Sequence, residues 1–331
     1  MISLLNAVVV PPLIALIVSG SLVALLMRGR AASLALDLPN RRSLHSTPTP
    51  RLGGVGIVAG IAAALAYANP PLEPLLLAAL TLLIGVSLLD DLKDVGVTWR
   101  LLIHVTSAGL AAFAVLQGAD WWVLTLAALA IAWMINLYNF MDGSDGLAGG
   151  MATTGFGFYG IAAALDGAPA FATLCFTVSA AAAGFLCLNF APARIFLGDV
   201  GAVPLGFLAA AIGALGWADQ HWSWWFPPLV FSPFIVDATL TLARRALRGE
   251  RVWQAHFDHY YQRLIRMGWS HRATALMEYA LMIVCGSAGL LALGAPAALQ
   301  AAVLSTAALV YIVLAFRIDR AWLRVQAIAN R

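Results

Sequence analysis

Charged side chains are the scarcest feature of this sequence. Asp, Glu, Lys and Arg make up 11% of its 331 residues, hydrophobic residues make up 62%, and the mean hydropathy is +0.87. A soluble domain is usually about 45–50% apolar and about 25% charged. A soluble fold of this length could not cover itself with so few polar groups, so the composition predicts an integral membrane protein.

Cysteine is also rare, and no basic segment opens the chain. Cys175, Cys187 and Cys285 all fall inside apolar segments, which favours small buried side chains over a disulfide framework. Arg28 and Arg30 follow the first apolar run instead of preceding it. That order argues against a cleaved signal peptide.

The apolar segments lack the two-residue alternation of membrane β-strands. They run for about 15–23 residues, which suits helices crossing a hydrocarbon core of about 30 Å, whereas barrel strands are shorter and alternate. We therefore predict an all-α polytopic membrane protein with about eleven transmembrane helices, forming one domain over residues 1–331. The expected spans are 4–27, 53–68, 74–89, 101–117, 121–137, 148–165, 170–189, 202–216, 226–243, 273–293 and 298–316.

Basic residues are missing from every second loop. All 19 Lys and Arg fall in segments 28–52, 90–100, 190–201 and 244–272 or after residue 316. The opposite loops carry no Lys or Arg, and their charged residues are all acidic, namely Glu73, Asp120, Asp166 and Asp219. The positive-inside rule then places the N-terminus outside and the C-terminus in the cytoplasm.

Several carboxylates lie on the predicted cytoplasmic side. Asp90, Asp91 and Asp94 end the third span, and Asp199 lies between two glycines just before the eighth. Adjacent carboxylates repel at a low-dielectric boundary, and a cation such as Mg²⁺, shared with phosphates, relieves that repulsion. A solvated helix end is the alternative interpretation of the acidic pair.

The segment NLYNFMDGSDGLAGG places Asn136, Asn139, Asp142 and Asp145 at intervals of three, before a glycine-rich turn. Ionisable groups at a membrane edge indicate a functional site. Asparagine is a poor primary ligand for Mg²⁺. We therefore expect this segment to form a wall of the site, with its Asp142 nearest to any metal held by the other carboxylates.

Basic groups and histidines accompany these acids. Arg51, held between a proline and two glycines, is a candidate phosphate ligand. His256, His259 and Arg263 have the spacing that one helix would present on one side, although a basic amphipathic helix on the membrane surface is an alternative. Asp237, before Arg244 on the ninth span, either belongs to the site or pairs with a neighbouring helix.

The other two histidines of interest are expected to lie outside the site. His104 is predicted to be a hydrogen-bond partner between helices, and His221 to be solvated among interfacial tryptophans.

Six motifs occur in one order: TPRLGG, LLDDLKD, NLYNFMDGSDGLAGG, FLGDVG, FIVDATLTLARR and HFDHYYQRL. In these six motifs the chain resembles the polyprenyl-phosphate N-acetylhexosamine-1-phosphate transferases of the glycosyltransferase family 4 type. The resemblance covers roughly residues 40 to 275. The last motif is most similar to the bacterial branch that starts O-antigen synthesis with 6-deoxy sugars such as N-acetylfucosamine or N-acetylquinovosamine.

The resemblance implies a reaction at the cytoplasmic face of the bacterial inner membrane. Undecaprenyl phosphate attacks the sugar-linked phosphorus of a UDP-N-acetylhexosamine, and UMP is released, which begins a lipopolysaccharide or other cell-envelope polysaccharide. Mg²⁺, or Mn²⁺ in its place, would be bound by Asp199 with Asp90 and Asp91. The resemblance leaves open whether Asp90 removes a proton from the acceptor or only positions it.

The resemblance also implies substrate-binding roles. The nucleotide side would be lined by Asn136, Asn139, Asp142 and Asp145, with Phe196 stacking on uracil. His256, His259 and Arg263 would hold the diphosphate or the sugar. Asp258 stands where basic residues are common in the family, which is a departure from its pattern.

Two other functions compete with this hypothesis. DDLKD fits the DDxxD motif of intramembrane prenyltransferases, but NLYNFMDGSDG is a poor second aspartate-rich motif. A transporter would place ionisable residues near the bilayer midplane. The expected partners are the lipid bilayer and the two substrates, with no nucleic acid; the sugar, and whether the chain forms a homodimer, stay open.

Overall fold

The structure is a computed structural model that describes residues 2–28, 32–39, 47–70, 73–93, 95–252 and 256–329. Arg30, Asp94 and the basic pair Arg41 and Arg42 lie outside the described residues. Apart from one antiparallel pair of two-residue strands, β1 (Leu36–Asp37) and β2 (Thr49–Pro50), the described regular structure is helical. The all-α prediction is confirmed.

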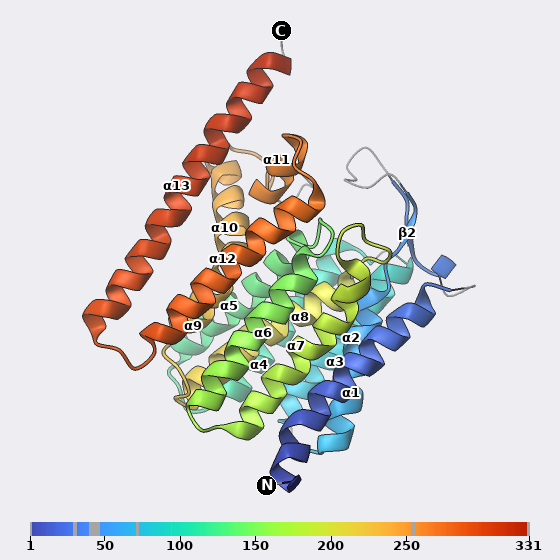
Figure 1. Cartoon of the computed structure of the whole chain (residues 1–331), viewed down its shortest axis with the longest axis vertical. Coiled ribbons are helices and arrows are strands. Elements are labelled where there is room, and N and C mark those ends of the chain that lie inside the picture. The colour runs from blue at the N-terminus through green and yellow to red at the C-terminus, as the bar shows by residue number, and fades with distance from the viewer. Residues whose placement is uncertain are drawn as a thin grey trace.

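The helices follow one another along the chain as Figure 1 shows. They are α1 (Ile2–Leu26), α2 (Gly53–Ala68), α3 (Pro74–Lys93), α4 (Val97–Val115), α5 (Trp121–Phe140), α6 (Leu147–Leu165), α7 (Pro169–Asn189), α8 (Asp199–Ala218), α9 (Phe226–Val230), α10 (Ser232–Leu247), α11 (Tyr260–Arg266), α12 (His271–Ala292) and α13 (Ala297–Ala329).

Every segment expected to span the membrane is helical in the structure. Within the described residues, 8 helices are long and apolar enough to cross a membrane, and α2 is a shorter apolar helix. The two ends of the chain lie at opposite ends of the molecule (Figure 1), as an odd number of crossings requires. The number of crossings and the sidedness of the termini stay predictions.

The predicted ninth span is divided into α9 and α10. Phe231 separates the two helices, and Pro233 follows it at the start of α10. Proline has no N–H to donate and its ring disfavours helical geometry in the preceding turn, so the helix is interrupted although its apolar composition continues.

Small residues let the helices pack closely around α8. A Cβ at Gly206 of α8 would lie 2.6 Å from the backbone oxygen of Met134 on α5, and one at Gly184 of α7 would lie 2.5 Å from the oxygen of Leu16 on α1. Such contacts are typical of membrane helix interfaces, where small side chains allow backbones to approach. The first contact holds α8 against α5, and the second holds α7 against α1. Most residues of α8 are buried in the bundle, and Asp199 is its first residue.

Candidate active site

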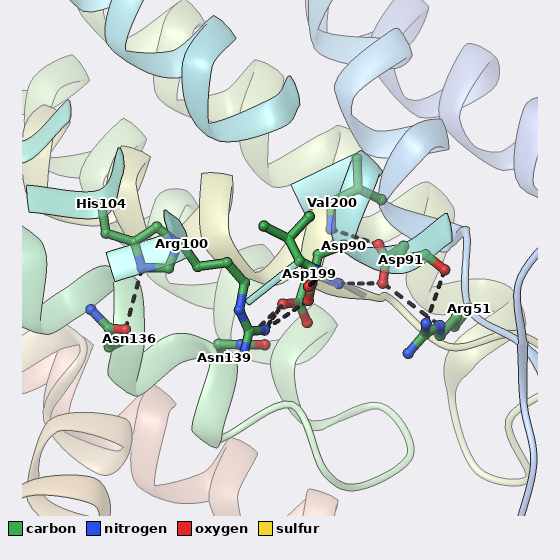
Figure 2. Close-up of polar contacts among 10 residues, drawn as sticks. Arg51, Asp90, Asp91, Arg100, His104, Asn136, Asn139, Asp199 and Val200 are labelled. Carbon is green, nitrogen blue, oxygen red and sulfur yellow. Dashed lines mark hydrogen bonds and ion pairs between the residues drawn. The ribbon is translucent and has the colours of Figure 1, made fainter. Parts of the chain in front are cut away.

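The end of α3 meets the start of α8. The carboxylate of Asp91 accepts hydrogen bonds from the backbone N–H groups of Asp199 (3.1 Å) and Val200 (2.9 Å), as Figure 2 shows. The first N–H groups of a helix have no partner within the helix and carry partial positive charge. Asp91 therefore caps α8 from another helix and sets the position of Asp199.

Arg100 joins two of the carboxylates. Its Nη1 atom lies 2.7 Å from Asp90 Oδ2 and 3.1 Å from Asp199 Oδ2 (Figure 2). Asp90 also accepts the backbone N–H of Val95 at 2.7 Å, and the side-chain amide of Asn139 reaches Asp199 at 3.5 Å. One guanidinium from α4 thus balances part of the negative charge that α3 and α8 bring together.

Arg51 approaches from the other side. Its Nη2 atom donates to the backbone oxygen of Asp91 at 2.9 Å, and its Nε atom lies 3.8 Å from the carboxylate of that residue. Its side chain is 39% exposed, so the guanidinium keeps a face open to solvent or a ligand. Its predicted role toward phosphate stays a prediction.

Glycines bring the RLGG segment against the FLGDVG segment. Gly53 and Gly54 donate backbone hydrogen bonds to the oxygens of Phe196 and Leu197, at 2.9 and 2.8 Å. A Cβ on Gly54 would lie 2.2 Å from the backbone nitrogen of Gly201, so no larger residue fits there. This backbone contact places Arg51 beside the start of α8, and leaves Phe196 half-buried at the junction.

The donor set fits a hard cation such as Mg²⁺. Carboxylate oxygens are the protein ligands that Mg²⁺ prefers, and Asp90, Asp91 and Asp199 supply them. Asp142 makes no side-chain hydrogen bond within the described residues; burial, together with the nearby charges of Asp199 and Asp91, raises its pKa well above the ordinary value. In the described part of the chain, no group of three or more His, Cys, Asp or Glu side chains is placed to hold a metal ion, so the role of these acids toward Mg²⁺ stays a prediction.

The loop that carries His256 and His259 just before α11, called the histidine loop below, is held by Asp237. This buried carboxylate lies 3.1 Å from His259 Nδ1, and it accepts the backbone N–H groups of Tyr260 (2.9 Å) and Tyr261 (3.1 Å) at the start of α11. Of the two alternatives for Asp237, pairing with a neighbouring element is the one observed. Its carboxylate can only accept, so Nδ1 of His259 carries the proton in this contact.

The expectation that one helix presents His256, His259 and Arg263 together is wrong. α11 begins at Tyr260, so both histidines precede it, with their rings 4.9 Å apart. Arg263 is buried and lies 2.8 Å from Asp319 of α13. The guanidinium therefore faces α13; its proposed contact with substrate stays untested.

The pKa values of both neighbours of Phe257, His256 and Asp258, are shifted. Burial, and then the neighbouring His259, lower the pKa of His256 to about 4. Burial is the largest single influence and would raise the pKa of Asp258, but the hydrogen bond and charge of Arg245, together with the charges of His256 and Arg263, outweigh it and lower the pKa. Asp258, the departure from the family pattern, is thus neutralised by an arginine of α10.

The histidine loop lies against the asparagine and aspartate segment. The Tyr261 hydroxyl donates to the backbone oxygen of Phe140 at 3.2 Å, and a Cβ on Gly143 would lie 2.1 Å from that hydroxyl. The rings of Phe140 and His259 stack with centroids 6.4 Å apart. The two segments, distant in sequence, therefore form one surface next to Asn139.

Comparison with known proteins agrees with this geometry. The model of the family described as "Glycosyl transferase family 4" matches residues 74–216, which run from α3 to α8. A phospho-N-acetylmuramoyl-pentapeptide-transferase of Moorella thermoacetica is 30% identical over 322 residues, covering 88% of this chain and 98% of that protein. The chain belongs to the polyprenyl-phosphate hexosamine-1-phosphate transferases.

Other members of this family show similar identity over a shorter length. A probable undecaprenyl-phosphate N-acetylglucosaminyl 1-phosphate transferase of Bacillus subtilis is 29% identical over 267 residues, 74% of each chain. An undecaprenyl-phosphate alpha-N-acetylglucosaminyl 1-phosphate transferase of Yersinia pestis is 29% identical over 264 residues, 72% of this chain and 71% of that protein.

Asn136 and Asp145, two further predicted site residues, also have structural partners. Asn136 donates to the backbone oxygen of Ala132 at 2.7 Å and lies 3.3 Å from His104 Nδ1, which confirms His104 as a partner between helices. Asp145 accepts the backbone N–H of Ala193 at 2.9 Å and lies 3.6 Å from His271. Asp145 thus ties the loop before α8 to the start of α12, and its predicted contact with the nucleotide is untested.

Three residues that shape the site were not predicted from the sequence. At the level of sequence, Arg100 entered only the count of basic residues in segment 90–100. In the structure it bridges Asp90 and Asp199. Asp319 and His271, which anchor Arg263 and Asp145, stand outside the recognised motifs. The one available signal was the position of Arg100, a single arginine opening the span that follows the acidic pair.

Proposed function

We propose that the protein transfers N-acetylhexosamine 1-phosphate from a UDP-sugar to undecaprenyl phosphate and releases UMP. The observation that carries the proposal is the meeting of α3 and α8, where Asp90, Asp91 and Asp199 lie beside Arg51 and Arg100 at one end of a membrane bundle. The names of the relatives from Bacillus subtilis and Yersinia pestis support undecaprenyl phosphate as acceptor and N-acetylglucosamine 1-phosphate as the transferred group.

The reaction joins two anionic partners, so the site needs positive charge beside the reacting phosphates. An oxygen of the lipid phosphate attacks the sugar-linked phosphorus, a new P–O bond forms, and the bond to the bridging oxygen breaks so that UMP leaves. Arg51 and Arg100 are positioned to hold anionic oxygens during that exchange. Bound by Asp199 with Asp90 and Asp91, Mg²⁺ would neutralise charge on the diphosphate.

The surrounding residues orient the donor in this proposal. Asn139 and Asp142 belong to the nucleotide side, together with Phe196 as the stacking surface for uracil. His259, fixed by Asp237, presents Nε2 toward the diphosphate or the sugar, and His256 lies beside it. A lipid phosphate is already ionised at neutral pH, so the carboxylate pair needs to position the acceptor more than to deprotonate it.

Location and pathway follow from the same reasoning. Asp90, Asp91, Asp199 and the histidine loop belong to the set of loops that carries the basic residues, while the opposite loops carry none, so the site faces the cytoplasm of a bacterial inner membrane. We further infer that the product starts a cell-envelope polysaccharide such as O-antigen. The HxxHxYQRL form of the last motif favours a 6-deoxy-N-acetylhexosamine as the sugar.

The experiment is a UMP-release assay on purified protein in liposomes. With UDP-N-acetylglucosamine and undecaprenyl phosphate we expect UMP only when Mg²⁺ is added, and no UMP when the lipid phosphate is omitted. Competition by UDP-N-acetylfucosamine and UDP-N-acetylquinovosamine then identifies the preferred sugar. Release of inorganic diphosphate from a prenyl donor, without UMP, would show prenyl transfer and refute the proposal.

A further inference from the structure

A cavity of about 890 Å³ lies at the end of the molecule opposite the carboxylates. Three turns surround it, α6–α7, α8–α9 and α12–α13, which lie toward the lower end of Figure 1. Ligand sites in proteins are usually concave and occupy about 300–1,000 Å³. The cavity is therefore large enough for a ligand that the proposed reaction does not use.

Aromatic faces and neutral hydrogen-bonding groups line this cavity together. Trp217 and Trp224 are 40% and 68% exposed. Gln220 and Ser223 lie between them on the α8–α9 turn, and neither makes a side-chain hydrogen bond within the described part of the chain. A ligand could therefore pack on indole while forming hydrogen bonds with an amide and a hydroxyl.

The walls of the cavity are fixed by their own bonds. Trp222 and Trp225 are buried, and their Nε1 atoms donate to the oxygen of Gly213 (2.9 Å) and to Gln300 Oε1 (3.0 Å). The Gln300 amide also donates to Ala295 at 2.9 Å, so the α8–α9 and α12–α13 turns are connected. The ligand surface is thus held before any ligand arrives.

Gln220 follows the end of α8 and lines the cavity. Its φ angle is 64°, in the left-handed region, and the backbone N–H of His221 donates to the oxygen of Gly216 at 2.8 Å. This is a common way for a helix to end, so the turn that ends α8 places the Gln220 amide at the edge of the cavity. Glycine would adopt the same φ angle without strain.

The charges of the lining disfavour anionic ligands. No Lys or Arg is among the described residues that line the cavity, which disfavours phosphates and lipid headgroups that carry them. The one carboxylate, Asp166, lies 2.8 Å from His221 Nδ1. The sequence context predicts a solvated His221, but the structure pairs this histidine with Asp166. The paired carboxylate is less available to a cationic ligand.

We propose that this cavity binds a neutral sugar ring on the face of the membrane opposite the proposed active site. A hydroxylated ring offers an apolar face to indole and a rim of hydroxyl groups to Gln220, Ser223 and the Asp166–His221 pair. Because the site lies at the other end of the bundle, its variants leave UMP release unchanged. Failure of either proposal is therefore separable from failure of the other.

The test measures sugar binding to the full chain in lipid nanodiscs without sugar-based detergent. Saturation-transfer NMR titrations with N-acetylglucosamine and with chitobiose give the Kd. Trp224→Ala should weaken binding about tenfold, and Gln220→Gly, which tolerates the left-handed backbone and removes the side chain with its amide, should do so similarly. Trp121→Ala is the matched control, because Trp121 is 78% exposed and does not line the cavity.

Three results overturn the inference. One is the absence of saturable binding of either sugar. Another is an equal Kd for Trp224→Ala and the Trp121→Ala control. The third is binding of tetramethylammonium that depends on Trp224 while the sugars do not bind, which would assign the cavity to a cation.

Discussion

Replacing Asp237 by alanine tests how the histidine loop is held over the site. The buried carboxylate accepts the backbone N–H groups of Tyr260 and Tyr261, accepts the Thr241 hydroxyl at 3.1 Å, and lies 3.1 Å from His259 Nδ1. Alanine removes all four contacts together. The start of α11 then loses its cap and His259 loses the group that orients its ring.

The size of the effect follows from these contacts. Loss of a helix cap costs about 1 kcal/mol, and each buried donor left unpaired costs about 1–3 kcal/mol. Some donors will find water, so we expect Asp237→Ala to destabilise the protein by about 3–5 kcal/mol. Displacement of His259 by about 1 Å should lower kcat by about 10²-fold.

Thermal unfolding and UMP release, measured on the same preparation in liposomes, separate the two effects. Thr241→Val, which removes one hydrogen bond and keeps the cap, should cost about 1 kcal/mol and leave kcat nearly unchanged. Asp237→Asn keeps one accepting oxygen and should fall between the two. An Asp237→Ala protein with wild-type kcat and wild-type thermal stability would refute the account of the loop.

Three further predictions test other parts of the structure. Gly54→Ala places a Cβ 2.2 Å from Gly201 nitrogen and should abolish UMP release by separating the RLGG segment from α8, unlike Gly85→Ala, which meets nothing within 4 Å. Arg100→Ala should lower kcat by about 10²-fold without unfolding the protein, since its two carboxylates can take a metal instead; unchanged kcat would remove this arginine from the site. Burial, and then His259, lower the pKa of His256 from 6.5 to about 4, so the unfolded chain binds the extra proton and stability rises with pH across that window. Solvent screening limits this rise in the free energy of unfolding to about 1 kcal/mol. His256→Gln should flatten it, and unfolding measured as a function of pH tests this.

The helices were predictable because hydropathy and length decide them. The break at Phe231 was missed although Pro233 marks it in the sequence, because the segment stays apolar on both sides of it. The start of α11 was missed for a different reason. Asp237 accepts the N–H groups of Tyr260 and Tyr261, so a contact with another helix, and not the local spacing of the histidines, decides where this helix begins.

The candidate site was predictable in outline because its acids share the basic side of the membrane. Charge counting could place Asp90, Asp91 and Asp199 at one face, and the structure brings them together. Counting could not show which cation meets which anion. Arg100 bridges to Asp199 across 99 positions of the chain, and no local pattern encodes such a pairing.

UMP release by Asp199→Asn, compared with Asp219→Asn, tests the central claim most directly. The two residues lie at opposite ends of α8, so the same chemical change is made at the carboxylate site and away from it. With UDP-N-acetylglucosamine, undecaprenyl phosphate and Mg²⁺ in liposomes, we expect Asp199→Asn to lose about 10³-fold in kcat and Asp219→Asn to match the wild type. Turnover by Asp199→Asn within a few-fold of the wild type would contradict the assignment of the active site to the meeting of α3 and α8.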